Sequence, residues 1–395
     1  MKFLIVSPYL PYPTSGARAR NYYLLKALAH RHTVSLLALV DITEAGAYSD
    51  QSLPEDFAHI TRVIPRPTPH SKRWQQLITA ARGKSYLLNL FTSVEMQDAL
   101  DTIMACDHYD VVLFESVLIS GYRVPGNVKV VIDQHNIEHE LLQRTYQHER
   151  MSLRRFYNWQ EYRLIKQAEI ERCRKANLIL VTSERERLLL KSMLPRNVIE
   201  VVSNGVDTDA FRGMCAEQEV AKQIIFSGAM NYYPNVDAVL FFAQKCWPLI
   251  RAQVPDASWQ IVGRNPPSEV QRLAELPGVT VTGSVPDVRP YLTASVVAIA
   301  PLHIGSGTRL KILEALAMQK AVVSTSLGCE GLSVVPGKHL IVADEPEAFA
   351  KAVIELMKHP AKRRALGMAG RSLVEAEYSW ERCGNQLLHA LEKIN

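Results

Sequence analysis

Several marks of specialised proteins are missing from this chain of 395 residues. It has no run of the roughly 18 to 20 apolar residues that a membrane-spanning helix needs, and the apolar segment at residues 3–6 is too short for a signal-peptide core. Its six cysteines include no C-x-x-C pair, so no zinc or redox motif is indicated. We therefore expect a globular, cytoplasmic protein whose cysteines are reduced packing residues.

The chain also lacks a strong charge of either sign. Its formal net charge is only +5 at pH 7, which is weaker than expected of a dedicated nucleic-acid binder. A mild positive charge suits a phosphate-bearing ligand or an anionic membrane surface. We therefore expect no nucleic acid among its partners.

What the chain does contain is a regular alternation of short apolar runs with helical patterns, which is typical of parallel sheets covered by helices. The predicted strands of the first half are residues 3–7, 34–39, 111–114, 128–132 and 178–181. The second half continues with residues 224–227, 259–262, 279–282, 296–300, 322–325 and 340–342. The pattern predicts an α/β fold of two Rossmann-like, doubly wound domains.

The connection between the two strand series contains Asn204-Gly205, a turn signal. We predict a first domain at residues 1–203 and a second at residues 204–379, followed by a terminal helix at residues 380–395. Two domains of somewhat under 200 residues agree with usual domain sizes. Ser183-x-x-Glu186 is a capping box that predicts the start of a helix in the first domain.

The densest group of functional candidates follows the predicted strand 296–300. Gly305 and Gly307 would let the backbone approach an anion closely, and the first-turn amides of the next helix would face it. Arg309 and Lys311 place positive charge where the helix dipole disfavours it, which indicates an anionic ligand. Glu314, about one turn further on, can accept hydrogen bonds from ribose hydroxyls. The alternative is a glycine-rich turn before a surface helix with two solvated basic residues.

Together with other segments, these residues resemble the retaining glycosyltransferases of family 4, which have the GT-B fold. The resemblance covers essentially the whole chain. Its motifs are Pro11-Tyr12-Pro13-Thr14-Ser15-Gly16, Asp133-Gln134-His135-Asn136-Ile137-Glu138, Ser203-Asn204-Gly205-Val206-Asp207, Gly228-Ala229-Met230 and residues 307–314. It implies an interdomain cleft that binds a nucleotide-sugar donor, and a C-terminal helix that joins the first domain.

The resemblance also implies roles for single residues. Gly16 would abut the donor diphosphate, and His135 would lie near the transferred sugar. Arg309 and Lys311 would neutralise the leaving diphosphate, Glu314 would hold the ribose, and the loop 282–287 would cradle the base. The donor-binding residues implied in this way are Gly16, Gly228, Gly283, Val285, Ser306, Gly307, Thr308, Arg309, Lys311 and Glu314.

Two further residues stand at or just beyond the carboxyl ends of predicted strands, where ligands bind in such sheets. His135 is either a catalytic residue or a hydrogen-bonded packing residue. The role of Glu115 is undecided in the same way: it is an acceptor-side group, a base or a packing residue.

The sequence departs from the family pattern at two places. Members commonly carry paired glutamates with seven residues between them, but Ser306 occupies the first of these positions. Many members also place Arg and Lys just after the strand that opens the second domain, whereas here Gly228 is followed by Ala229 and Met230. The sugar is therefore undetermined, and the diphosphate charge must rest mainly on Arg309 and Lys311.

We expect neither a metal nor another cofactor besides the nucleotide-sugar donor, because no Asp-x-Asp motif and no cluster of His and carboxylate side chains is expected to be available to hold a metal. Many transferases use a divalent metal to stabilise the departing diphosphate, and here Arg309, Lys311 and helix amides would replace it. The resemblance implies retention of anomeric configuration, with the leaving phosphate oxygen helping to deprotonate the acceptor.

The stretch from residue 70 to residue 89 mixes basic, aromatic and aliphatic side chains, which suits docking on an anionic membrane surface. Its basic residues are Lys72, Arg73, Arg82 and Lys84. The alternative is an ordinary solvated helix face. By resemblance, a lipid-linked saccharide in surface polysaccharide or glycolipid synthesis would fit as acceptor, and soluble acceptors remain open.

Two other classes of function also remain open. A sugar-nucleotide epimerase of the same fold would convert the donor with no acceptor present. A non-catalytic sugar-nucleotide-binding protein would release no nucleoside diphosphate when an acceptor is added.

Overall fold

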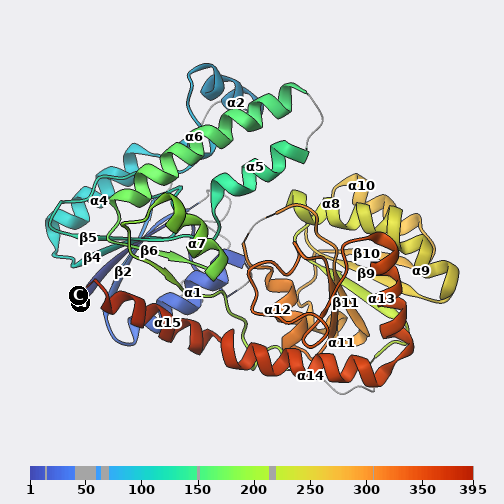
Figure 1. The fold of residues 1–395 in the computed structure, drawn as a ribbon. Coiled ribbons are helices and arrows are strands. Elements are labelled where there is room, and N and C mark those ends of the chain that lie inside the picture. Colours follow the sequence, from blue (N-terminus) through green and yellow to red (C-terminus); the bar gives the residue numbers. More distant parts are fainter. Residues whose placement is uncertain are drawn as a thin grey trace. The chain divides into compact units, whose positions relative to one another are not determined.

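The structure is a computed structural model of the chain. It describes residues 1–13, 16–40, 59–63, 71–148, 152–212, 219–305 and 307–394. The chain divides into two compact units, Met1–Ser203 with Cys383–Asn395, and Asn204–Arg382. Each unit contains its own parallel sheet (Figure 1).

The first unit has a seven-stranded sheet in the order β3-β2-β1-β4-β5-β6-β7. All neighbouring strands run parallel, and the strand order reverses between β1 and β4. The central strands are buried at almost every residue because helices cover both faces of such a sheet. The strands are β1 (Lys2–Ser7), β2 (Thr33–Leu39), β3 (His59–Val63), β4 (Val111–Phe114), β5 (Lys129–Asp133), β6 (Leu178–Val181) and β7 (Ile199–Val201).

Four helices of this unit begin at a serine whose hydroxyl accepts a backbone hydrogen bond, which satisfies one of the unpaired amides of the first turn. The serines are Ser85, Ser93, Ser152 and Ser183. The helices are α1 (Gly16–Ala29), α2 (Lys72–Ala81), α3 (Tyr86–Leu90), α4 (Val94–Cys106), α5 (Glu138–His148), α6 (Leu153–Lys175) and α7 (Glu184–Met193). The predicted capping box opens α7, and Glu186 accepts hydrogen bonds from Thr182 rather than from Ser183.

The second unit has a six-stranded parallel sheet in the order β10-β9-β8-β11-β12-β13, so its strand order reverses between β8 and β11. The strands are β8 (Gln223–Ser227), β9 (Ser258–Val262), β10 (Val279–Gly283), β11 (Val297–Ala300), β12 (Ala321–Ser324) and β13 (Ile341–Val342). The helices are α8 (Tyr233–Phe241), η3 (Phe242–Cys246), α9 (Trp247–Gln253), α10 (Ser268–Gln271), η4 (Arg272–Glu275), α11 (Arg289–Ala294), α12 (Leu310–Ala317), α13 (Pro346–Lys358), α14 (Pro360–Glu377) and α15 (Trp380–Glu392).

The last helix, α15, begins in the second unit, and from Cys383 onward its residues belong to the first. Within the first unit its Gln386 accepts a hydrogen bond from the Ser203 amide at 2.9 Å. Gly384 packs so closely on α1 that an added Cβ would lie 2.6 Å from Ala27. Among the described residues, none of the helices is both long enough and apolar enough to cross a bilayer.

The predicted fold class, two doubly wound α/β domains, is confirmed. Two strands were not predicted, and both are the edge strands of the first sheet, β3 and β7. Edge strands face solvent on one side and carry polar residues, as Thr61 and Glu200 show. They therefore lack the apolar run that reveals the central strands.

Candidate functional site

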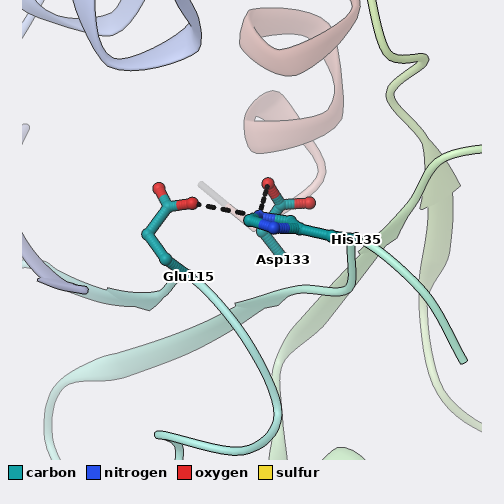
Figure 2. Close-up of side chains that lie close together, drawn as sticks. All are labelled: Glu115, Asp133 and His135. Carbon is teal, nitrogen blue, oxygen red and sulfur yellow. Dashed lines mark hydrogen bonds and ion pairs between the residues drawn. The ribbon is translucent and has the colours of Figure 1, made fainter. Parts of the chain in front are cut away.

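Three polar side chains gather at the carboxyl ends of neighbouring strands in the first unit (Figure 2). Glu115 follows β4, Asp133 ends β5, and His135 stands two residues later. Nε2 of His135 lies 3.3 Å from Oε2 of Glu115 and 3.4 Å from Oδ2 of Asp133. Parallel strands place their carboxyl ends at one edge of the sheet, so the topology brings these residues together.

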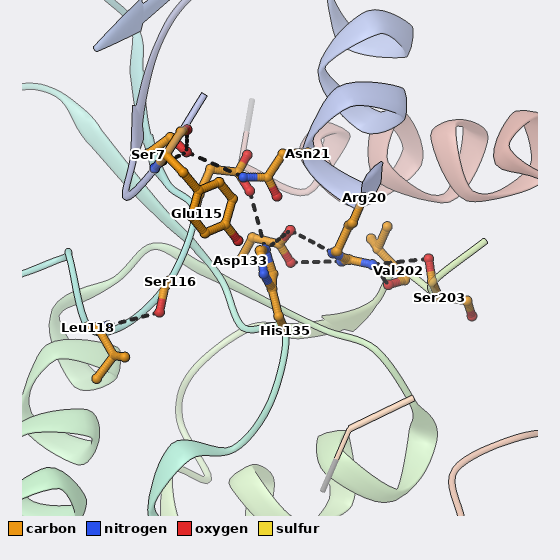
Figure 3. A network of polar contacts seen from close by, with 11 residues as sticks. Ser7, Arg20, Asn21, Glu115, Ser116, Leu118, Asp133, His135, Val202 and Ser203 are labelled. Carbon is orange, nitrogen blue, oxygen red and sulfur yellow. Dashed lines mark hydrogen bonds and ion pairs between the residues drawn. The ribbon is translucent and has the colours of Figure 1, made fainter. Parts of the chain in front are cut away.

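Arg20 of α1 fixes the middle of this group (Figure 3). Its guanidinium binds Asp133 through two hydrogen bonds, Nε to Oδ2 at 2.9 Å and Nη2 to Oδ1 at 2.8 Å. Its Nη1 donates to the carbonyl oxygens of Val202 at 2.8 Å and Ser203 at 3.1 Å. The side chain is fully buried. Through these hydrogen bonds Arg20 links Asp133 to Val202 and Ser203, at the end of the first unit's main segment.

The charges around His135 determine its protonation. Burial lowers the pKa of His135, but its hydrogen bonds to Asp133 and Glu115 outweigh that effect and raise the pKa to about 9. Burial would raise the pKa of Asp133, but the charge of Arg20 and the hydrogen bond from His135 hold it well below its usual range. Burial raises the pKa of Glu115 above its usual value. At neutral pH the group therefore holds its proton on His135, which acts as a hydrogen-bond donor.

The segment after β5 is held by Glu169 of α6. This buried carboxylate accepts hydrogen bonds from Gln134 Nε2 at 3.0 Å and from the backbone amides of Glu138 at 3.2 Å and His139 at 3.1 Å. Two of those amides belong to the first turn of α5, so Glu169 caps that helix from another element. The position of His135 is thereby constrained on both sides of the loop that carries it.

Glu115, Asp133 and His135 also offer three metal-ligating atoms within 4.8 Å of one another. The sequence did not reveal this cluster, and the expectation that no such group of side chains exists is wrong. Both oxygens of Asp133 already bind Arg20, and a protonated His135 has no lone pair on Nε2 to give to a metal. As it stands, the cluster is an ion-pair network around a proton.

The expectation that the chain has no Asp-x-Asp motif is also wrong, because Asp207-Thr208-Asp209 is one. In the structure Asp207 Oδ1 accepts hydrogen bonds from the backbone amides of Asp209 at 3.1 Å and Ala210 at 2.8 Å. Asp209 pairs with Arg212 at the surface, at 2.7 Å. These contacts make the motif a turn with a surface ion pair.

In the second unit, the segments after β8 and β11 meet where the strand order reverses. Gly228 follows β8 with a φ of 152°, and an added Cβ would lie 2.8 Å from Lys311 Nζ. Lys311 lies at the start of α12, and its ammonium donates to Asn235 Oδ1 at 2.6 Å and sits 3.8 Å from the centroid of the Phe226 ring. A side chain from α12 thus reaches across to the end of β8.

Arg309 lies at the N-terminus of the same helix. Its side chain donates to the carbonyl oxygen of Gly307, and the residue is only 8% exposed. Gly305, with a φ of 130°, leaves room for it, because an added Cβ would lie 3.0 Å from Arg309 Nη2. Gly307 has a φ of 73°, and both glycines adopt backbone conformations that other residues rarely do. Ser306 lies outside the described residues.

Two ionisable side chains at this end of α12, Lys311 and Glu314, are partly buried, and burial shifts their pKa values. Burial, together with the nearby charge of Arg309, lowers the pKa of Lys311 well below its usual value. Burial raises the pKa of Glu314, one turn further along the helix, to about 7, although Lys311 opposes this shift. An anion bound here would favour the protonated form of Lys311.

The remaining predicted donor-binding residues fall in both units. Gly16 opens α1 with a φ of 60° and has open space where a Cβ would be. Gly283 ends β10 with a φ of 72°, and Val285 beyond it is half-buried against the core of the second unit. Thr308 is also half-buried, between Gly307 and Arg309. Within the first unit the structure joins His135 to Glu115, and within the second it places Lys311 beside Gly228.

Sequence reasoning missed four residues of these groups, one of which is Glu169. Arg20 and Asn235 carry no motif of their own, and Asp133 stood in a quoted motif without a role. Their partners lie far away in the sequence, since Arg20 and Asp133 are 113 residues apart. Only the strand order brings such residues together.

Comparison with known proteins agrees with this architecture. The model of the family described as "Glycosyltransferase Family 4" matches residues 14–210, and that of "Glycosyl transferases group 1" matches residues 221–359. Sucrose-phosphate synthase from Thermosynechococcus elongatus is similar with a TM-score of 0.75 and 17% identity, over 100% of this chain and 99% of that one. Anabaena HepE in complex with UDP-glucose has a TM-score of 0.68 and 13% identity, over 99% of each chain.

A curated relative is more similar in sequence over a shorter region. It is a GDP-mannose-dependent monoacylated alpha-(1-6)-phosphatidylinositol monomannoside mannosyltransferase of Corynebacterium glutamicum, 31% identical over 160 residues, which are 38% of this chain and 42% of that protein. The chain spans half or less of the length of the curated relatives it matches.

The two family models together cover most of the chain, and the structural neighbours share its two parallel-sheet units along their whole length. The chain belongs to the glycosyltransferases of family 4 and has the GT-B fold.

Proposed function

We propose that the protein transfers a sugar from a nucleotide-diphosphate donor to a hydroxyl group of an acceptor. The observation that carries this proposal is the arrangement around Gly228 and α12, where Lys311 and Arg309 gather at the reversal point of the second sheet. Ligands of doubly wound sheets bind at such points. Two part-buried cations beside glycine backbone fit a diphosphate better than a neutral ligand. The similar Anabaena protein carries UDP-glucose in its crystal structure.

In this proposal the leaving diphosphate is stabilised by Arg309, Lys311 and the first amides of α12, and no metal is required. The bond from the anomeric carbon to the phosphate oxygen breaks, and the bond to the acceptor oxygen forms on the same face of the sugar. The acceptor proton passes to the departing phosphate oxygen, so configuration is retained. Negative charge grows on the phosphate during this step, which makes the nearby cations catalytic.

We assign the group around His135 to the sugar and the acceptor. No hydrogen-bond partner is seen for Nδ1 of His135 in the part of the chain that the structure describes, and this atom carries a proton when the ring is charged. It can donate to a hydroxyl of the transferred sugar. Glu115, whose pKa is raised, faces His135 and is assigned to the acceptor side.

Two measurements test the proposal. Thermal unfolding in the presence of different nucleotide sugars identifies the donor, because a ligand at about 100 times its dissociation constant adds about 2.7 kcal/mol to stability. Release of nucleoside diphosphate is then followed with and without candidate acceptors. Release that depends on the acceptor supports transfer. Conversion of the donor without any acceptor would instead indicate an epimerase, and binding without turnover a non-catalytic protein.

We further propose a lipid-linked saccharide as acceptor, in surface polysaccharide or glycolipid synthesis, and docking of the first unit on an anionic membrane.

On α2, Trp74 and Leu77 are each 62% exposed, and Lys72 and Arg73 beside them are exposed too. Gln160 of α6 donates to the carbonyl oxygen of Ala80 on α2, so the two helices touch. The N-terminal part of α6 exposes Leu153, Phe156 and Trp159. Basic and apolar side chains exposed together suit a surface of anionic lipids. The corynebacterial relative acts, by its name, on a phosphatidylinositol monomannoside.

A further inference from the structure

The ammonium of Lys311 occupies an unusual place. Lys311 is the second residue of α12, where a positive charge is disfavoured by the helix dipole. Its Nζ nevertheless lies over Gly228, just past β8, and not over its own helix. Something other than α12 must therefore hold this charge where it is.

Asn235 is the group that holds it. This residue of α8 is only 7% exposed. Its Nδ2 donates to the carbonyl oxygen of Ala229 at 2.8 Å, and its Oδ1 accepts from Lys311 Nζ at 2.6 Å. Because the carbonyl oxygen of Ala229 can only accept a hydrogen bond, it fixes which end of the Asn235 amide faces Lys311. The loop after β8 thus orients Asn235, and Asn235 orients the ammonium.

The ammonium is only partly satisfied by these contacts. It has three N–H donors, of which one goes to Asn235, while the Phe226 ring at 3.8 Å covers one side by a cation–π contact. Within the described ranges no other hydrogen-bond partner of Lys311 is seen. Gly228 has no side chain, and the 2.8 Å between its would-be Cβ and Nζ shows that any other residue would intrude on the ammonium.

We propose that Asn235 is a positioning residue, which holds the ammonium of Lys311 above Gly228 so that a cation carried by α12 serves a diphosphate at the end of β8. This inference rests on the proposed function, since it takes the diphosphate of a nucleotide sugar as the ligand. It explains how the second unit places a cation just after β8, where residues 229–234 include no Lys or Arg.

The charge state of Lys311 provides a measurable quantity that would not change if Asn235 had a purely structural role. The groups that act on it are Arg309, which disfavours the charged form, and Glu314, which favours it. The amide oxygen of Asn235 accepts from the charged form and also favours it. Affinity for a diphosphate should therefore fall as pH rises and Lys311 loses its proton, with a midpoint that depends on residue 235.

The experiment is calorimetric titration with UDP, GDP and ADP, and with the matching nucleosides, across a range of pH. Asn235→Ala should weaken binding of the diphosphates at least about fivefold, given that hydrogen bonds to charged groups are worth more than this when lost outright. It should also move the pH midpoint downward, whereas Asn235→Asp should move it upward because a carboxylate stabilises the ammonium. Nucleoside binding should not change. Asn231→Ala is the matched control, an exposed asparagine of the loop between β8 and α8.

The double variant Asn235→Ala/Lys311→Ala decides whether the two residues act as one unit. We expect it to bind the diphosphates no more weakly than Lys311→Ala alone, because a positioning residue has no effect once the group it positions is gone. Additive losses, or equal midpoints in Asn235→Ala and Asn235→Asp, would overturn the inference. If Lys311→Ala weakens binding while Asn235→Ala does not, this inference fails and the proposed function stands. If neither Lys311→Ala nor Arg309→Ala alters binding, the phosphate site itself is wrong.

Discussion

Arg20 forms an ion pair with the carboxylate of Asp133 in the protein interior, where little water solvates either charge. Its partner Asp133 is 2% exposed, and Arg20 is fully buried. We expect Arg20→Gln to lower the free energy of unfolding by about 3 to 5 kcal/mol, because it leaves the buried carboxylates of Asp133 and Glu115 with only His135 to compensate them. Urea denaturation measures the loss. The control Arg187→Gln removes a surface pair with Glu184 and should lower the free energy of unfolding far less, because water screens surface ion pairs. Similar small losses in both variants would contradict the buried ion pair.

His135 links the same network to pH. Its pKa in the folded protein, about 9, lies above its usual 6.5. Its contribution to stability is therefore complete below pH 6.5 and disappears as pH rises through 9. We expect His135→Asn to be less stable than the parent at pH 6, by at most about 3 kcal/mol, and the difference to shrink by pH 10. Urea denaturation of both proteins at the two pH values measures it. A difference that does not change with pH would mean that His135 is neutral when folded.

At the scale of elements, the sequence shows where α12 begins but not where the charged groups of its side chains lie. The glycines, the basic residues and the apolar spacing all lie within residues 305–317, and they predict the loop and the helix correctly. Periodicity places Lys311 on the helix surface. Its ammonium goes to the end of β8 because β8 and β11 are neighbours in the sheet, and that neighbourhood is a property of topology rather than of local sequence.

The two cations of this element can be tested together. Arg309→Ala and Lys311→Ala should each weaken binding of the nucleoside diphosphate by about ten- to 150-fold, the usual effect of losing a hydrogen bond to a charged group. Turnover should fall further, because the negative charge on the phosphate grows in the transition state. Calorimetry with nucleoside and nucleoside diphosphate makes the comparison. Lys358→Ala, an exposed basic residue of α13, is the control. Unchanged affinity in both test variants would remove α12 from the phosphate site.

The exposed face of α2 supports a separate prediction. Replacing the four basic residues on and just after this helix by glutamine should reduce binding to vesicles that contain anionic lipid, because each exposed basic residue near such a surface contributes about 1 kcal/mol. High salt should weaken the parent in the same way. Vesicle sedimentation measures both effects. The four residues are Lys72, Arg73, Arg82 and Lys84. A control with the same charge change on the second unit replaces Lys351, Lys358, Lys362 and Arg364. Equal losses in the two variants would show that net charge, and not this surface, governs binding.

For the whole molecule, the repeated alternation of strands and helices was enough to predict two doubly wound domains, because each buried strand is a short apolar run. The site was harder to predict. His135 and Glu115 were predicted as site residues from their places at or just beyond strand ends, and in the structure Nε2 of His135 lies 3.3 Å from Oε2 of Glu115. The residues that orient them, Arg20 and Glu169, lie on helices and have no periodic signal that distinguishes them from solvated charges. Their roles follow from the order of strands β1, β4, β5 and β6, which the sequence did not specify.

The balance of charge in both units leads to a prediction about metals. In the first unit Arg20 and the proton on His135 already compensate the carboxylates that could bind a cation. In the second, Arg309 and Lys311 supply the positive charge that a metal would otherwise bring to a diphosphate. We therefore expect transfer, with whichever nucleotide sugar supports it, to continue at an unchanged rate in excess EDTA. The release of nucleoside diphosphate, measured with and without the chelator and again after adding magnesium or manganese, gives the comparison. Complete loss of activity, restored by either ion, would show that a metal takes part in the reaction, and elemental analysis of His135→Asn would then show whether the cluster around His135 holds it.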